Sequence, residues 1–150
     1  MMRLYIKLAI TMLLTAFSAV SFGAEHIVKM LNNGKEGQMV FEPSVLKINA
    51  GDSVTFKATD GGHNSASIPG LVPEGGQEWQ GNLNQDLTVK FDKEGVYVYQ
   101  CTPHIALGMI GVIQVGSPTN IRDVKESISS LESMIVMNKE RVQQYLAKVN

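Results

Sequence analysis

Short runs of alternating apolar and polar residues, separated by turn residues, constrain the fold of this 150-residue chain more than any other feature. Strand side chains point to opposite faces in turn, so an alternating run predicts a strand with one buried face. Such runs occupy residues 26–31, followed by a predicted turn at 32–34, then 45–49, 53–57 and 87–91, and two further strands are predicted at 96–100 and 110–115. Many short strands with turns between them are typical of a β-sandwich or barrel.

The pattern changes in two other parts of the chain. Residues 60–82 are rich in Gly, Pro and polar side chains, and so long a connection in a compact domain is often functional. After Gly116-Ser117-Pro118, apolar residues recur at helical spacing. We therefore expect a tail of two helices at about 118–150 that covers one face or end of the sandwich. Ser129 and Glu132 have the spacing of a capping box and predict the start of the second helix.

The first 23 residues predict a secretory signal peptide. Arg3 and Lys7 precede an apolar stretch at 8–20, and Ser21-Phe22-Gly23 has small residues at the two positions that a signal peptidase inspects. The apolar stretch is shorter than the ~20 residues that a membrane span needs. We place the cleavage after Gly23, so that the mature domain is 24–150, and we expect a periplasmic protein, monomeric and not attached to the membrane after cleavage.

Charge and cysteine content exclude several classes of function. The formal net charge is −1, from 13 Lys and Arg, 14 Asp and Glu, and removal of the signal peptide takes away two positive charges. Nucleic-acid binding needs clustered basic charge, which this chain lacks. The single cysteine cannot form an internal disulfide or a four-cysteine metal cluster.

The residues that can carry chemistry lie mostly in one loop between two predicted strands. Cys101, His104 and Met109 form the pattern C-x2-H-x4-M, and His63 lies upstream in the long connection. One thiolate, two imidazoles and a thioether are the ligand set of a blue copper electron-transfer centre. Taken singly, a Cys or a Met is more often an ordinary core residue. An unpaired thiol in an oxidising compartment, however, is a liability unless something occupies it.

Two other kinds of copper protein fit the sequence less well. A binuclear copper site with bridging thiolates needs a second cysteine, which is absent. A multicopper oxidase has histidines beside its cysteine, whereas Gln100 and Thr102 flank Cys101. A copper carrier or sensor without an electron-transfer role uses the same residues as an electron shuttle and stays open.

Two further readings use the same residues without copper. A thiol hydrolase could pair Cys101 with His63 or His104 as the base, oriented by Asn64, although this leaves Met109 unexplained. Zinc could also occupy the cysteine and the two histidines. Composition alone does not exclude either reading.

The chain resembles the pseudoazurins, a family of type 1 copper proteins within the cupredoxins. The resemblance rests on the loop from Cys101-Thr102-Pro103-His104 to Gly108-Met109-Ile110, on Gly62-His63-Asn64, and on the early segments 30–32 and 39–43. It covers essentially the whole mature chain, including the two-helix ending. It implies a mainly β Greek-key sandwich with two C-terminal helices, one copper ion that cycles between Cu(II) and Cu(I), and an electron shuttle rather than an enzyme.

The resemblance also implies roles for single residues. His63, Cys101 and His104 are the implied equatorial ligands, and Met109 is the axial ligand. Asn64 is expected to hydrogen-bond near the cysteine sulfur and to tie the two ligand loops together, which is how outer residues orient ligands. Met39 is expected close to the exposed histidine. The apolar docking patch around His104 is expected to consist of Pro43, Pro103, Ile105, Ala106 and Leu107.

The implied partners are transient periplasmic redox proteins, namely copper nitrite reductase or a c-type cytochrome. In well-known family members a ring of lysines surrounds the docking patch, whereas the matching positions here are Asn33, Gly61, Gln80 and Gln100. Charge steering raises association rates and sets partner choice. A weaker basic zone could come from Lys29, Lys35 or Lys57. We therefore expect docking to rest mainly on apolar contact, as suits a small transient interface.

Overall fold

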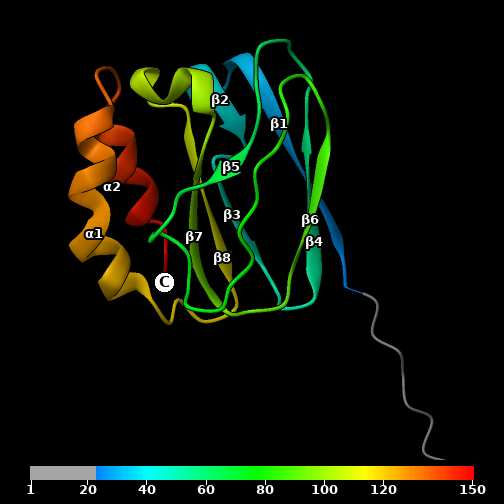
Figure 1. The fold of residues 1–150 in the computed structure, drawn as a ribbon, viewed down its shortest axis with the longest axis vertical. Helices are drawn as coiled ribbons and strands as arrows, with labels where there is room; N and C mark the ends of the chain where they lie inside the picture. Colours follow the sequence, from blue (N-terminus) through cyan, green and yellow to red (C-terminus); the bar gives the residue numbers. More distant parts are fainter. Residues whose placement is uncertain (1–22) are drawn as a thin grey trace, which may run out of the picture.

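The computed structural model describes residues 23–150, and residues 1–22 of the predicted signal peptide lie outside the described residues. Two sheets pack face to face, and two C-terminal helices cover the outer side of one sheet (Figure 1). The strands are β1 (Glu25–Gly34), β2 (Gly37–Glu42), β3 (Val45–Ile48), β4 (Asp52–Lys57), β5 (Ala66–Ser67), β6 (Leu87–Phe91), β7 (Gly95–Gln100) and β8 (Ile110–Val115). The helices are η1 (Thr102–Leu107), a short 3-10 helix, α1 (Ile121–Met134) and α2 (Glu140–Leu146).

The strand order confirms the predicted mainly β sandwich with two C-terminal helices. One sheet has the order β2-β1-β4-β6 and the other has the order β3-β8-β7-β5. The chain changes sheet at each step from β2 to β7, so β1 pairs in parallel with β4 and β3 pairs in parallel with β8. This crossing brings the loop after β4 and the loop after β7 to the same end of the molecule.

The predicted strands are confirmed, but the pattern misses two others. β1 continues to Gly34, so the predicted turn at 32–34 is wrong, and the chain turns at 35–36 instead. β2 was expected only from the family resemblance, because Val40 and Phe41 are both buried and break the alternation. β5 lies inside the long connection and is only two residues long, too short to leave a periodic signal.

An aromatic core lies between the two sheets. Phe56 stacks on Trp79 with 5.5 Å between ring centroids, and Tyr99 meets Phe41 edge-on at 4.7 Å. The indole N–H of Trp79 donates a hydrogen bond to Ser65 Oγ at 2.9 Å, so its polar atom is satisfied although the ring is buried. The loop that carries His63 is thereby attached to the core.

A second core lies between the β7–β8 sheet and the helices. Val96 and Val98 of β7 face the helices, while Tyr97 and Tyr99 face the aromatic core. Both faces of β7 are therefore covered, which explains why residues 96–99 are all apolar rather than apolar at alternate positions. Within the described part of the chain, the helices are too short or too polar to cross a bilayer.

The predicted start of the second helix is wrong. Ser129 and Glu132 lie inside α1, which continues to Met134. Val124, Ile128 and Leu131 form one buried stripe through this region, so the packing of the helix decided its length and the local capping signal did not.

Asp52 holds the first strand in place. Its carboxylate accepts hydrogen bonds from His26 Nε2 at 2.9 Å and from the backbone N–H groups of Asn49 at 3.0 Å and Ala24 at 2.8 Å. These bonds, chiefly the one from His26, hold the pKa of Asp52 below its usual value. The ionised carboxylate therefore stabilises the folded chain.

We expect Asp52→Asn to lower the thermal denaturation midpoint at pH 7 by a few degrees. A carboxyl whose folded pKa is depressed contributes stability above its unfolded pKa of about 3.9, and this contribution is lost as the pH falls through the folded pKa. The difference between the variant and the wild type should thus shrink below pH 4 in melts followed by circular dichroism. Asp92→Asn is the control, because Asp92 forms only an exposed ion pair with Lys90. An equal effect of the two variants contradicts the prediction.

Candidate metal centre

Two loops at one end of the sandwich bring the predicted site residues together. His63 lies between β4 and β5, and Cys101 follows the last residue of β7. The loop from Cys101 to Met109 is closed on itself, because Cys101 N donates to Met109 O at 2.9 Å and Met109 N donates to His104 O at 3.2 Å. The pairing of β7 with β8 thus fixes both ends of the loop.

Local chemistry shapes this loop. Pro103 stands at the start of η1, where a missing N–H costs nothing. Gly108 ends η1 with φ of 74°, a conformation that favours glycine. A Cβ atom there would lie 2.7 Å from the carbonyl oxygen of Met137, so the α1–α2 loop packs directly on this position.

Three donor atoms converge at the centre of the site. Cys101 Sγ lies 3.6 Å from His63 Nδ1 and 3.5 Å from His104 Nδ1, and the two nitrogens are 3.1 Å apart. Met109 is fully buried beside them, held by its two backbone bonds to the loop. The four predicted ligand residues are therefore all at one place.

The spacing of these atoms fits a metal ion. The circle through the three donor atoms has a radius of about 2.0 Å, and nitrogen and sulfur ligands bind metals such as zinc at about 2.0–2.3 Å. A mixed set of thiolate, imidazole and thioether suits copper in both of its oxidation states. The chemistry and the size of the site thus agree.

Asn64 connects the two loops. Its Oδ1 accepts a hydrogen bond from Thr102 N at 2.8 Å, and its Nδ2 donates to Thr102 Oγ1 and to Gly81 O, both at 3.1 Å. Because Thr102 follows Cys101, these bonds set the position of the cysteine relative to His63.

Asn32 is a part of the site that sequence reasoning missed. His63 Nε2 donates to Asn32 Oδ1 at 2.9 Å, and Asn32 N in turn donates to Asp60 Oδ2 at 2.7 Å. With the ring hydrogen on Nε2, the lone pair of Nδ1 points toward Cys101, as a metal ligand requires. The sequence carries no signal for this contact, since Asn32 reads as a turn residue and meets His63 only through the fold.

Comparisons with known proteins agree with this geometry. Residues 28–116 match the model of the copper-binding proteins of the plastocyanin/azurin family. A putative pseudoazurin of Rhizobium leguminosarum bv. viciae is 44% identical over 126 residues, 83% of this chain and 82% of the relative. A pseudoazurin of Paracoccus pantotrophus is 38% identical over 138 residues, 91% and 92% of the two chains. The crystal structure of native pseudoazurin from Hyphomicrobium denitrificans superposes with a TM-score of 0.76 at 38% identity, covering 85% of this chain and 99% of the other.

The chain belongs to the pseudoazurins. As a pseudoazurin, it is a blue copper electron-transfer protein with copper as its cofactor, and it is not an enzyme. The thiol hydrolase and the zinc site considered from the sequence are therefore set aside, as is a copper carrier without an electron-transfer role.

Burial controls the protonation of the pseudoazurin site in the absence of metal. Burial lowers the pKa of His63, and the nearby His104 lowers it further. Burial raises the pKa of the Cys101 thiol, while backbone hydrogen bonds from Asn64 and His104 act in the opposite direction. Copper binding must therefore displace the thiol proton.

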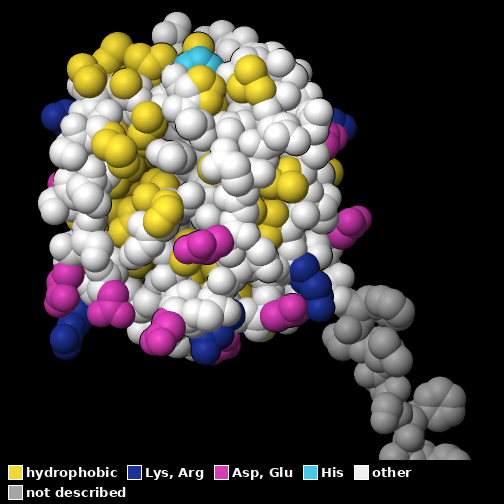
Figure 2. Space-filling view, in the orientation of Figure 1, with side chains coloured by type: hydrophobic (Ala, Val, Ile, Leu, Met, Phe, Trp, Pro, Cys, Tyr) yellow, Lys and Arg dark blue, Asp and Glu magenta, His cyan; other side chains and the backbone are white. Residues whose placement is uncertain are grey.

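Only one of the four predicted ligand residues reaches the surface. His63, Cys101 and Met109 are fully buried, whereas His104 is partly exposed. Around it, Pro103 and Ala106 are exposed, and Ile105 and Leu107 are half-buried. Figure 2 shows a histidine among hydrophobic side chains at this end of the pseudoazurin fold.

Of the two other predicted residues, Met39 lies on β2 and Pro43 directly follows this strand and lines a separate cavity. The carbonyl of Met39 accepts a hydrogen bond from Arg141 Nη1 at 3.0 Å, and the same nitrogen donates to Gly108 O at 3.1 Å. Met39 is thus close to the ligand loop. Pro43 precedes Ser44, whose carbonyl accepts from Val112 N at 2.8 Å, so Pro43 lies toward the end where β8 begins.

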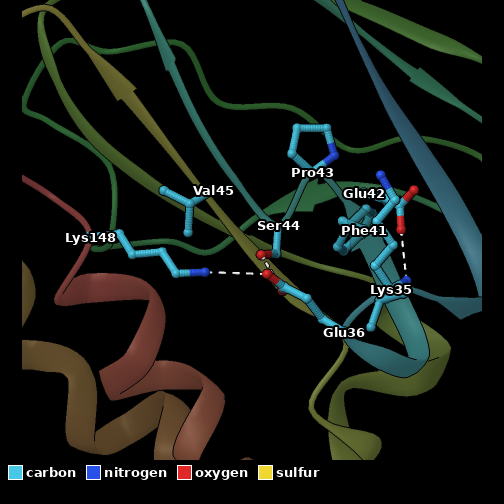
Figure 3. A pocket seen from close by; sticks show the side chains of 9 residues that line it. Lys35, Glu36, Phe41, Glu42, Pro43, Ser44, Val45 and Lys148 are labelled. Carbon is cyan, nitrogen blue, oxygen red and sulfur yellow. Dashed lines mark hydrogen bonds and ion pairs between the residues drawn. The ribbon is translucent and has the colours of Figure 1, made fainter.

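A separate cavity of about 220 Å³ opens between the β2–β3 turn and α2, away from the donor atoms (Figure 3). Inside it, Ser44 Oγ donates to Glu36 Oε2 at 2.5 Å, and Lys148 Nζ pairs with Glu36 Oε1 at 3.2 Å. The polar groups of this cavity satisfy one another, so we assign it to the attachment of the C-terminal tail.

Proposed function

We propose that this pseudoazurin carries single electrons to a periplasmic reductase, and that His63, Cys101, His104 and Met109 hold its copper ion. The observation that supports this most is the convergence of Cys101 Sγ and the two Nδ1 atoms on a circle of about 2.0 Å radius. Bound copper supplies one-electron chemistry by cycling between Cu(II) and Cu(I).

The chain contributes a rigid set of donors. Asn32 fixes the ring of His63, and Asn64 fixes the loop that carries Cys101. Side chains held in this way move little when an electron arrives or leaves, since outer hydrogen bonds and packing lock their orientation. A preformed site suits repeated one-electron transfer better than release of the metal.

Electrons enter and leave through the exposed edge of His104 in this proposal. The surrounding patch of Pro103, Ile105, Ala106 and Leu107, with Pro43, forms the docking surface for the partner. A copper nitrite reductase is the proposed acceptor and a c-type cytochrome is an alternative partner, in each case bound transiently to a monomer.

The test of this function separates electron transfer from metal delivery. Copper-loaded protein should show intense visible absorption and lose it reversibly on one-electron reduction. In stopped-flow experiments, the reduced protein should transfer an electron to a c-type cytochrome within seconds. With a catalytic amount of copper nitrite reductase, it should be fully reoxidised only when nitrite is present to accept the electrons. Transfer of copper to a competing chelator faster than transfer of electrons contradicts the proposal.

The periplasmic location rests on the predicted signal peptide and its cleavage after Gly23. The backbone nitrogen of Ala24 lies 2.8 Å from Asp52 Oδ1, so cleavage there creates an ammonium group beside a buried carboxylate. A charge-assisted hydrogen bond from this ammonium group is stronger than the hydrogen bond from a neutral backbone amide that it replaces. Mass spectrometry of protein secreted into the periplasm should find Ala24 as the first residue.

A further inference from the structure

The last residue of α1 and the loop that follows it expose large apolar side chains. Met134, Val136 and Met137 have relative exposures of 45%, 74% and 55%, whereas Ile135 between them is buried in the core. Ile135 and Val142 pack in the core between the sheet and the helices. The backbone that carries the exposed side chains is therefore held in place. We call Met134, Val136 and Met137 the apolar loop.

The apolar loop is hydrogen-bonded to the ligand loop, which runs from Cys101 to Met109. The backbone N–H groups of Val136 and Met137 both donate to Ala106 O, at 2.8 and 3.0 Å. Asn138 Nδ2 donates to Leu107 O at 2.9 Å. Figure 1 shows the α1–α2 connection beside η1 at the same end of the molecule, and Figure 2 shows hydrophobic side chains on this end. The apolar surface around His104 therefore continues onto the helical tail.

This joined surface carries no formal charge along its chain segments. Residues 102–108 and 134–138 contain no Lys, Arg, Asp or Glu. Lys139 and Glu140 follow directly and are exposed, but their charges have opposite signs. The guanidinium of Arg141 is buried against backbone carbonyls. Exposed apolar area of this kind marks an interaction site, and the opposite charges of Lys139 and Glu140 at its border add no net charge that would attract a strongly charged partner.

We propose that the apolar loop is the second half of the docking surface, and that it fits a redox protein whose own surface around its prosthetic group is apolar and poor in charge. The inference rests on the proposed function, because it takes His104 as the point of electron exit. Burial of apolar area then drives the encounter, and charge steering contributes little. The apolar loop is continuous with the apolar patch around His104, where electrons leave the protein. We therefore expect a redox protein, rather than another kind of protein, to bind there.

Electron self-exchange between two copies of this protein measures how well the apolar loop supports docking. In that reaction one copy loses an electron from Cu(I) and the other gains it at Cu(II), and each copy presents an apolar, charge-poor face to the other. We expect the double variant Val136→Thr, Met137→Gln to slow self-exchange about tenfold, as measured by NMR line broadening in mixtures of oxidised and reduced protein. Wild-type self-exchange should change less than threefold between low and high ionic strength.

Matched controls separate this inference from the proposed function. Ile27→Thr changes an equally exposed apolar side chain on β1 and should leave self-exchange unchanged. Oxidation of the reduced double variant by hexacyanoferrate(III), which needs no protein docking face, should stay within twofold of wild type. Self-exchange of the double variant within twofold of wild type, or a wild-type rate that changes more than threefold with salt, overturns the inference. A wild-type protein without colour or electron exchange instead overturns the proposed function.

Discussion

Cys101→Ser removes the visible colour of the copper-loaded protein completely and leaves the sandwich folded. The colour arises from charge transfer between the thiolate sulfur and copper, and a serine hydroxyl cannot supply it. Residue 101 keeps its backbone bonds to Met109 and His104 in the variant, so the loop retains its path. Visible absorption after addition of Cu(II), together with far-ultraviolet circular dichroism, measures both parts of this expectation.

The matched control for this variant is His26→Gln. His26 is a histidine outside the centre, where it contacts Asp52, so its removal should leave the colour intact. Full colour in Cys101→Ser, or its loss in His26→Gln, shows that the donor set has been misassigned.

Arg141→Met should cause the largest loss of stability. The Arg141 side chain is buried, with 5% relative exposure, and its guanidinium donates to the carbonyls of Met39, Gly108 and Gln38 at 2.9–3.1 Å, with a longer contact to Glu36. Methionine keeps most of the apolar stem but leaves these carbonyls without a donor. The bond to Gly108 O is buried, whereas the bonds to Met39 O and Gln38 O are part-buried. A buried unsatisfied group costs about 1–3 kcal/mol and a partly hydrated one costs less, so we expect a total loss of about 3–5 kcal/mol.

Chemical denaturation of the metal-free protein measures this loss. Arg122→Met is the control, because the Arg122 side chain is 87% exposed and forms only a surface ion pair with Glu126, worth less than about 1 kcal/mol. A loss for Arg141→Met no greater than that of Arg122→Met contradicts the expectation. The visible spectrum is a second readout, since the Gly108 carbonyl immediately precedes Met109.

The sequence predicts the parts of this protein whose signals are local. Strands such as β4 and β6 alternate because each has one face in the core, and alternation can be read directly. The ligand loop is equally local, since the spacing from Cys101 to Met109 is set by the short path between two paired strands. The resemblance to the pseudoazurins rests mainly on the same loop, and it also predicts the strand β2, which alternation alone does not.

The parts that the sequence does not predict depend on contacts between distant segments. Asn32 orients His63 across 31 positions, and Arg141 reaches Met39 across 102 positions. Neither residue type signals its partner in the sequence. The start of the second helix is predicted wrongly because a local signal is present but does not decide the structure. Ser129 has the sequence of a helix start, yet the buried residues before and after it keep α1 continuous.

The contacts of Arg141 limit how freely this copper loop can be exchanged by protein engineers. Its guanidinium links α2 to the carbonyl of Gly108, and Gly108 itself lies against Met137. A shorter loop transplanted from a protein without a helical tail removes the Gly108 carbonyl, so the buried guanidinium of Arg141 loses one of its hydrogen-bond acceptors. Grafting should therefore succeed only when the tail is redesigned together with the loop, as a single module.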